Sequence, residues 1–465
     1  MTAVGGAGPG HTASAPHTPP MRVWLGATLT VGVVAAAGLQ QGAFFPGDAA
    51  IVALASLGVL TVELLLHRVD RSTALVVAAI CALCAWWLVR AVSIHSAGSF
   101  LPFGASLLGF AAAFAAIRPL SPRHREVTTL ALAALGTCEA LAGFVGMTFR
   151  WAPLAIPSQM LWRLSGSLTY ANAAGLVLAV IALASLGSNE RSVVTRLAVC
   201  LCLAGAIASQ SRGAGVALVG GAFFVPLDRY RALWLPLSLG ALTGAVAVGT
   251  SPSSGSVPLL ACTVGVAAVA SACVRARPIP AVSTRSARAR IGVIVAVGAG
   301  TTLLLHHVLA LRTLSPAALF DRDPEWLAAA HQFTLSPYVG VGPDQIMPFV
   351  NNSGYFTHFA HNEYLQVAAG AGVVGLALLA VVALAVARGV RRADVATSCA
   401  TGALVAFAVG GAFDYDWHLP AIAMVGGVVA ALASTRRPAD EDDGPLDDAV
   451  RGPDPTRVDR RGHPA

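Results

Sequence analysis

The stretch His361-Asn362-Glu363-Tyr364-Leu365-Gln366 joins a polar segment, 312–362, to an apolar run that continues over 363–387. An apolar run of this length is long enough to cross a lipid bilayer as a helix. The stretch therefore predicts a membrane-spanning helix whose first turn lies at the membrane boundary. A histidine at that boundary has water on one side and lipid on the other, which is a suitable place for a base that acts on a membrane-anchored substrate.

The composition also indicates a membrane protein. Hydrophobic residues make up 56% and charged residues 11% of the 465-residue chain, whereas a soluble domain carries about 25% charged residues. So little charge could not cover the surface of a soluble protein. The net charge of +7 comes from 30 arginines and no lysine. These arginines are scattered singly between apolar segments, which argues against a nucleic-acid-binding face.

Apolar segments of similar length recur along the chain and predict an all-α, polytopic membrane domain over residues 22–434. The predicted spans are 22–44, 48–67, 73–93, 99–118, 126–146, 171–188, 195–210, 214–227, 231–250, 257–274, 291–311, 363–387, 395–413 and 419–434. Because two of them are short and could form a kinked or re-entrant pair, we expect about 12 to 14 transmembrane helices. The flanking segments 1–21 and 435–465 are predicted to be disordered tails.

Loop charge predicts the orientation of these helices. One alternate set of loops carries 17 arginines, and the opposite set carries five: Arg150, Arg163, Arg212, Arg312 and Arg322. The arginine-rich loops of membrane proteins stay in the cytoplasm. Both termini are therefore predicted to be cytoplasmic, and the segment before His361 to face outward. The expected location is the cytoplasmic (inner) membrane.

Two extracytoplasmic loops, 147–170 and 312–362, are much longer than the other outward turns, and long loops in compact proteins are usually functional. In the second loop, Asp323-Pro324-Glu325 has the residue types of a helix start, and apolar residues follow at helical spacing. The run Gly340-Val341-Gly342-Pro343 then interrupts the pattern. We expect a short amphipathic helix near the outer membrane surface, followed by an irregular segment.

The outward arginines are candidates for binding an anionic substrate. A guanidinium group is always charged and can hold phosphate oxygens through two parallel N–H bonds. Arg163 and Arg212 have small polar neighbours, and we favour a functional role for both. For Arg150 and Arg322, in the two long loops, two interpretations stay open: substrate binding, or contact with lipid headgroups or nearby acids.

His361 is the candidate catalytic base. An imidazole has a pKa near about 6.5 and can be neutral outside the cell, and removing a proton from an attacking hydroxyl contributes about 10²–10⁴-fold in rate. The alternative is an interfacial histidine next to a helix cap at Asn362 and an acidic first turn at Glu363. Asp414 and Asp416 lie in a polar outer turn. They could orient the base, pair with an arginine, or simply be solvated.

Other polar residues fall inside the predicted spans. Glu139 is a functional candidate by default because it is an acid at membrane depth, but a hydrogen bond to a neighbouring helix is an equal alternative. All eight cysteines lie in apolar spans. Although Cys81-x-x-Cys84 has redox-motif spacing, we interpret the cysteines as small, inert residues rather than a disulfide or metal site.

Four of these segments resemble motifs of the O-antigen ligase and polymerase family of membrane glycosyltransferases. Arg163-Leu-Ser-Gly-Ser-Leu-Thr-Tyr-Ala-Asn172 is similar to the family's Arg…Gly-x-x-x-x-x-Asn segment, and Ser211-Arg212-Gly213 to its Ser-Arg-Gly. The stretch 361–366, with the glycines after it, resembles the His-Asn-x-x-Leu-Gln…Gly signature. Phe413-Asp414-Tyr415-Asp416 matches the closing turn more loosely. The resemblance covers residues 125–430.

The resemblance implies an inverting glycosyltransferase at the outer face of the membrane. The implied donor is a polyprenyl-diphosphate-linked glycan that enters from the bilayer, and the acceptor is a hydroxyl of a glycan, lipid or protein. His361 would activate that hydroxyl. The implied binding residues for the diphosphate and glycan are Arg163, Arg212, Asn172, Asn362, Arg322, Arg150 and Asp414. No metal or other cofactor is implied, because fixed positive charge can stabilise a diphosphate leaving group.

Two other functions remain as alternatives. A transporter or lipid-linked glycan flippase would need charged residues along a path through the membrane and internal two-fold symmetry. In this sequence the charges gather at one face and no internal repeat is visible. A sensor or scaffold with a degenerate site is the third possibility. Ligase and polymerase reactions fit the same residues equally well.

Overall fold

The computed structural model describes residues 22–66, 69–158, 161–252, 257–274, 322–345, 358–390 and 394–434. The predicted tails 1–21 and 435–465, the predicted span 291–311 and Arg312 lie outside these residues.

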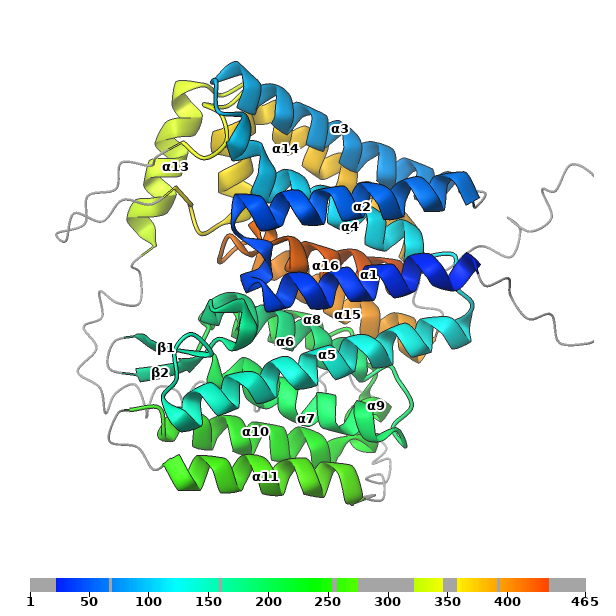
Figure 1. Cartoon of the computed structure of the whole chain (residues 1–465), viewed down its shortest axis with the longest axis vertical. Coiled ribbons are helices and arrows are strands. Elements are labelled where there is room, and N and C mark those ends of the chain that lie inside the picture. Colours follow the sequence, from blue (N-terminus) through cyan, green and yellow to red (C-terminus); the bar gives the residue numbers. More distant parts are fainter. Residues whose placement is uncertain are drawn as a thin grey trace, which may run out of the picture.

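The described chain forms a bundle of helices that run between two ends (Figure 1). Its helices are α1 (Arg22–Leu39), α2 (Pro46–Leu66), α3 (Arg71–Ser93), α4 (Leu101–Ile117), α5 (Pro122–Phe149), α6 (Ala171–Ser185), α7 (Val193–Ala208), α8 (Arg212–Ala222), α9 (Leu227–Ala232), α10 (Trp234–Gly249), α11 (Val257–Cys273), α13 (Asp323–Leu335), α14 (Glu363–Gly389), α15 (Val395–Gly410) and α16 (Pro420–Ala433). Short 3-10 turns are η1 (Gln41–Ala43), η2 (Ala97–Phe100), η3 (Gly166–Leu168) and η5 (Asp416–His418).

The helices confirm a multi-pass, helical membrane protein. Five of those described are long and apolar enough to cross a bilayer: α2, α3, α4 with the turn before it, α5 and α14. Seven further apolar helices are shorter: α1, α6, α7, α10, α11, α15 and α16. Every predicted span except 291–311 coincides with a helix. The 11-residue α8 accounts for one member of the expected short pair, and α13 is the expected helix of the second long loop.

Two of the shorter apolar helices, α6 and α16, lie inside the bundle. All residues of α16 are buried, and so are all residues of α6 except Asn172. With 15 residues, α6 is about 22 Å long, against about 30 Å for the hydrocarbon core of a membrane. Such helices contact protein rather than lipid, so non-helical polar segments can continue them at membrane depth.

Glycines allow the central helices to approach closely. A side chain at Gly427 of α16 would lie 2.4 Å from the carbonyl oxygen of Phe110 in α4, and one at Gly402 of α15 would lie 2.6 Å from the carbonyl oxygen of Gly221 in α8. Small residues at such crossings let helix backbones pack together in membranes. This packing brings the first residues of α6, α14 and α16 into one region of the bundle.

One end of the bundle carries α13 and a β-hairpin, at the left of Figure 1. The hairpin joins β1 (Ala155–Ser158) to β2 (Leu161–Leu164) in antiparallel pairing, with Ala155 opposite Leu164. It was not predicted from the sequence. The Trp162 N–H donates to the Ser251 carbonyl at 2.8 Å, so the hairpin is fastened to the turn that follows α10.

The opposite end is held by arginines from the arginine-rich loops. Arg118 pairs with Asp70 at 2.9 Å. Arg125 donates to the Ser434 carbonyl at the end of α16, at 2.6 Å. Guanidinium groups here satisfy carbonyls that helix ends leave unpaired. Within the described residues, the two predicted sets of loops therefore lie at opposite ends of the bundle.

Candidate functional site

Several polar side chains meet at the end of the bundle that carries α13 and the hairpin. They come from the segment before α6, from the start of α13, from the residue before α14 and from the turn between α15 and α16. We call this group the polar network, and its members are Arg163, Tyr170, Asn172, Arg322, Glu325, His361 and Asp414.

Asp414 is the centre of the polar network. The Tyr170 hydroxyl donates to its two carboxylate oxygens at 2.8 and 2.7 Å, and the Asn172 amide donates to Oδ2 at 2.6 Å. Arg322 Nη2 lies 3.9 Å from the same oxygen. These partners offset the cost of burying the Asp414 carboxylate. Burial, followed by the charge of Asp414, raises the pKa of Tyr170 well above its ordinary value, so the phenol remains a donor.

Arg163 joins the hairpin to this centre. Its Nε donates to the Ser209 carbonyl at 2.8 Å and its Nη2 to Asn172 Oδ1 at 2.5 Å. Burial lowers the pKa of Arg163, and the charges of Arg212 and Arg322 act in the same direction. An arginine keeps its charge even so. Three guanidinium groups therefore contribute positive charge to one region.

Glu325 links α13 to His361. The Glu325 Oε2 atom lies 2.7 Å from His361 Nδ1 and 2.9 Å from Arg322 Nη1. Burial would raise the pKa of Glu325, but His361 and Arg322 outweigh it and hold that pKa below its ordinary value. With Nδ1 facing a carboxylate, Nε2 is the ring nitrogen left for proton transfer. This arrangement has the geometry of an oriented base.

The backbone also constrains the imidazole. His361 has a φ of +48°, in the left-handed region that residues other than glycine seldom occupy. Such strain persists only where the surrounding structure enforces it, and it clusters at functional sites. The residue after His361 begins the capping of α14, so the strained position is held on its C-terminal side.

Asn362 and Glu363 attach the start of α14 to the end of α15. Asn362 caps α14 by accepting from the Leu365 N–H at 3.1 Å, and its amide donates to the Ala412 carbonyl at 2.9 Å. The Glu363 N–H donates to the Gly411 carbonyl at 2.7 Å. The capping interpretation of Asn362 is therefore confirmed. In this position Asn362 holds His361 against the turn that carries the central carboxylate.

That turn is buried, so its interpretation as an ordinary solvated turn is wrong. Glu363 Oε2 lies 2.9 Å from His418 Nδ1, and the imidazole of His418 stacks on Phe103 with ring centroids 4.8 Å apart. Asp416 is almost fully buried. Burial, followed by the neighbouring carboxylates, raises its pKa well above the ordinary value. The raised pKa favours the uncharged form of the Asp416 carboxyl group.

Arg150 lies outside the polar network. Its guanidinium donates to the carbonyls of Thr250, Ser251 and Pro252 at 2.7, 3.2 and 2.8 Å. It also lies over the ring of Trp162, 5.9 Å from the centroid. In this structure Arg150 fastens the hairpin to the turn after α10.

Arg212 begins α8 next to the polar network. Ser211 caps this helix by accepting from the Ala214 N–H at 3.2 Å, and Arg212 itself is exposed. Its charge acts on Arg163. Arg212 is thus placed to add positive charge for a ligand approaching from outside the protein.

Sequence reasoning missed several of these roles. Glu325 was interpreted only as a favourable first-turn residue of α13, although an acid that begins a helix in a functional loop was a usable signal. Arg90 was counted inside a span, but its Nη2 donates to the Gly340 carbonyl at 2.8 Å, at the end of the bundle that holds the polar network. Glu139 accepts from Ser167 Oγ at 2.6 Å and from two backbone N–H groups of η3. Within the part of the chain that the structure describes, Glu139 is therefore hydrogen-bonded to η3, the turn before α6, and not to a neighbouring long helix.

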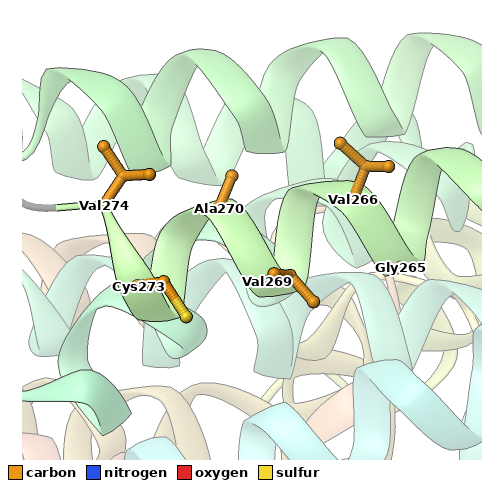
Figure 2. Close-up of a pocket in the computed structure, with 6 residues that line it drawn as sticks. All are labelled: Gly265, Val266, Val269, Ala270, Cys273 and Val274. Atoms are coloured by element: carbon orange, nitrogen blue, oxygen red, sulfur yellow. The ribbon is translucent and has the colours of Figure 1, made fainter.

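A second feature, an apolar groove on α11, lacks polar side chains (Figure 2). Its lining residues are Gly265, Val266, Val269, Ala270, Cys273 and Val274. A groove of this composition suits packing against lipid or an apolar helix, not chemistry. The polar network is accordingly the candidate site.

Among the residues that the structure describes, no group of three or more His, Cys, Asp and Glu side chains is placed to hold a metal ion.

Comparisons with known proteins do not identify a family. No model of a known protein family matches the chain, and a search of the curated proteins finds none that matches it.

Proposed function

We propose that the protein is a glycosyltransferase at the outer face of the cytoplasmic membrane. It transfers a polyprenyl-diphosphate-linked glycan to an acceptor hydroxyl, as the O-antigen ligase and polymerase family does. One observation carries the proposal. A carboxylate-paired histidine, His361, belongs to the same polar network as two arginines, Arg163 and Arg322, at one end of a membrane-embedded bundle.

His361 acts as the general base in this proposal. Glu325 holds the imidazole with its proton on Nδ1, and Nε2 takes the proton of the acceptor hydroxyl. The hydroxyl oxygen attacks the anomeric carbon from the face opposite the diphosphate. The bond between that carbon and the diphosphate oxygen breaks, and its electron pair leaves with the diphosphate. A positioned base of this kind contributes about 10²–10⁴-fold in rate.

The arginines hold the diphosphate. A guanidinium carries five N–H donors, and the two bonds that Arg163 makes within the protein engage two of them. Fixed positive charge in a site with little water stabilises the negative charge that develops on the leaving group. Asn172 and Asp414 position Arg163 and Arg322 for this role, and Arg212 adds charge at the entrance.

The architecture supports contact with a lipid-linked donor. In this proposal the polar network, which lies at one end of the bundle, is at the depth of the lipid headgroups and their phosphates. The short, enclosed α6 lets the segment around Arg163 reach inward from the membrane surface. Two further features agree with an outward-facing network. The opposite end carries the arginine-rich loops, and α1 begins and α16 ends there (Figure 1).

The resemblance to the ligase and polymerase family gains support from proximity. Arg163, Asn172, His361 and Asp414 come from three separate motifs of the sequence, and they belong to one hydrogen-bonded and ion-paired group. Among the described residues, the polar network gathers at one end of the bundle, whereas a transporter would need charged residues along a path through the bilayer. We therefore favour an enzyme over a flippase.

The test is transfer in vitro from a defined lipid-diphosphate oligosaccharide to an acceptor glycan, with and without a chelator. We expect the unaltered protein to form a new glycosidic bond under both conditions. His361→Ala should lower the rate by about 10²–10⁴-fold. His331→Ala, at an exposed position of α13, is the matched control and should keep it. Full transfer activity of His361→Ala would show that His361 is not the catalytic base. Movement of the donor across liposomes without a new bond would favour the flippase.

A further inference from the structure

Arg322 and His361 share one carboxylate oxygen. Arg322 Nη1 lies 2.9 Å and His361 Nδ1 lies 2.7 Å from the same atom, Glu325 Oε2. The other terminal nitrogen of Arg322, Nη2, faces Asp414 Oδ2 at 3.9 Å. Arg322 therefore stands between the carboxylate that orients the base and the carboxylate at the centre of the polar network.

Arg322 is also the accessible member of this chain of contacts. Its side chain is 34% exposed, whereas those of Glu325, His361 and Asp414 are 7%, 11% and 5% exposed. An incoming anion can reach Arg322 without displacing a buried group. A diphosphate also competes well with this carboxylate for the guanidinium, because it carries more negative charge and can accept two parallel N–H bonds, whereas Glu325 faces Arg322 through one oxygen.

We propose that Arg322 couples the donor to the base: when a diphosphate binds this guanidinium, Arg322 releases Glu325 Oε2, which then serves His361 alone. This inference rests on the proposed function. Its chemical consequence follows from the charges. A guanidinium close to the imidazole disfavours the protonated ring, and an unshared carboxylate favours it. The imidazole is therefore a weaker base in the empty site and a stronger base once the donor is present.

The other polar groups near His361 come from the turn before α16 and from the start of α14. Tyr415, from the turn before α16, packs edge-on against the imidazole with ring centroids 5.0 Å apart. Asp414 and Asp416 belong to the same turn. Glu363, at the start of α14, is paired with His418. Arg322, the residue before α13, is the group that exchanges one anionic partner for another.

The test follows the titration of His361 by carbon NMR of the full-length protein in lipid nanodiscs. The ring signal of His361 is assigned by its absence in His361→Gln. The probe is farnesyl diphosphate, which carries the diphosphate and an isoprenyl chain but no sugar, and farnesol is the matched uncharged control. We expect saturating farnesyl diphosphate to raise the titration midpoint by about one pH unit, the size of a nearby charge effect, and farnesol to leave it unchanged.

Two variants separate coupling from a direct effect of the bound charge. In Arg322→Gln the midpoint should already be raised without the probe, and the probe should move it by less than half of the wild-type shift. Arg191→Gln makes the same charge change at an exposed position at the opposite end of the bundle and should behave as wild type. If Arg322→Gln no longer binds the probe, Glu325→Gln takes its place in the test, because it keeps the guanidinium that binds the diphosphate. In Glu325→Gln the probe should also move the titration midpoint of His361 by less than in wild type.

The outcomes distinguish this inference from the proposed function. Binding of the probe is measured separately by phosphorus NMR. A probe that binds wild type without moving the His361 midpoint overturns the inference and leaves transfer activity unaffected. Wild-type-sized shifts in Arg322→Gln, or in Glu325→Gln, overturn it as well. If the probe does not bind wild type at all, the diphosphate site itself is contradicted, and both proposals fall.

Discussion

The hydroxyl of Tyr170 donates to the carboxylate of Asp414, 2.8 Å from Oδ1 and 2.7 Å from Oδ2, across 244 residues of sequence. This contact joins the segment before α6 to the turn before α16. Arg163 reaches the same carboxylate only through Asn172. Tyr170 thus positions the centre of the polar network without needing to touch substrate, and its hydroxyl can be removed without changing any charge.

Tyr170→Phe should lower both stability and transfer. The substitution leaves a buried carboxylate with one donor fewer, which costs about 1–3 kcal/mol. The displaced Asp414 should also slow transfer in the in vitro assay. Tyr230→Phe is the control, because the Tyr230 hydroxyl makes a comparable bond, 2.7 Å from the Ala222 carbonyl, in another part of the bundle. We expect Tyr230→Phe to lower the melting temperature by a similar amount and to keep the full rate of transfer. Equal transfer rates in the two variants would show that Tyr170 does not position the site.

Asp416→Asn should be tolerated, and its stability relative to wild type should increase with pH. Burial, with the neighbouring carboxylates, raises the pKa of Asp416 in the folded protein well above its ordinary value. The folded state therefore binds this proton more tightly than the unfolded state. Stability from this group is present below the ordinary carboxyl pKa and falls as pH rises towards the raised value. Asparagine removes that dependence, so the difference in melting temperature should increase between pH 5 and pH 8.

Asp414→Asn provides the contrast to Asp416→Asn. Asp414 accepts from Tyr170 and Asn172, so an amide would turn one acceptor oxygen into a donor that faces donors. We expect a lower melting temperature and slower transfer for this variant. If Asp416→Asn were the more damaging of the two, Asp416 would have to be ionised in the folded protein.

Labelling of single cysteines should locate the polar network outside the cell. In a variant without the eight native cysteines, a cysteine at the exposed position 331 of α13 should react with a membrane-impermeant maleimide in intact cells. A cysteine at the exposed position 191 should react only after permeabilisation. The physical reason is the asymmetry of loop arginines, because arginine-rich loops of membrane proteins are retained in the cytoplasm. The reverse pattern would place His361 on the cytoplasmic side and end the proposed function.

Hydropathy alone predicted most of the helices, because a helix in lipid must be apolar over its length whatever its partners. The site could be predicted in part for a similar reason. His361, Asn172 and Arg212 lie within the first turn of a helix or next to it, where polar residues stand out against the apolar run that follows. The start of each apolar helix can be located in the sequence. Arg163 and Asp414 were therefore also identified as candidates, because they lie in the polar segments that precede such helices.

Pairing between distant segments could not be predicted in the same way. The contact between Glu325 and His361 depends on how α13 docks against α14, which no local pattern specifies. Arg150 was a candidate for substrate binding, but its partners are backbone carbonyls of residues 250–252, which any sequence supplies. Burial of Asp416 was hidden for a related reason. A carboxyl group suggested contact with solvent, whereas the packing of the turn buries Asp416 and raises its pKa.

The helix α14 is interrupted at Gly372, which has a φ of +66° and a ψ of −163°. At this break the segment before α14 lies directly against the helix. The Val341 N–H donates to the Ala369 carbonyl at 2.8 Å, and the Val373 N–H donates to the Pro337 carbonyl at 2.8 Å. The close approach that this glycine permits is thus between a helix and the loop following α13, the helix that carries Glu325.

Gly372→Ala should therefore disrupt the site from a distance. An added Cβ would lie 2.4 Å from the backbone carbonyl carbon of Tyr338, and alanine at this backbone conformation is strained in any case, at a cost of about 1–3 kcal/mol. We expect a lower melting temperature and slower transfer, since the displaced loop moves α13. Gly265→Ala is the control, because a Cβ there meets nothing within 4 Å in the groove of Figure 2. The free energy of unfolding of Gly265→Ala should rise by up to about 1 kcal/mol, because alanine has a higher helix propensity than glycine. Wild-type transfer in Gly372→Ala would show that the loop after α13 does not position Glu325.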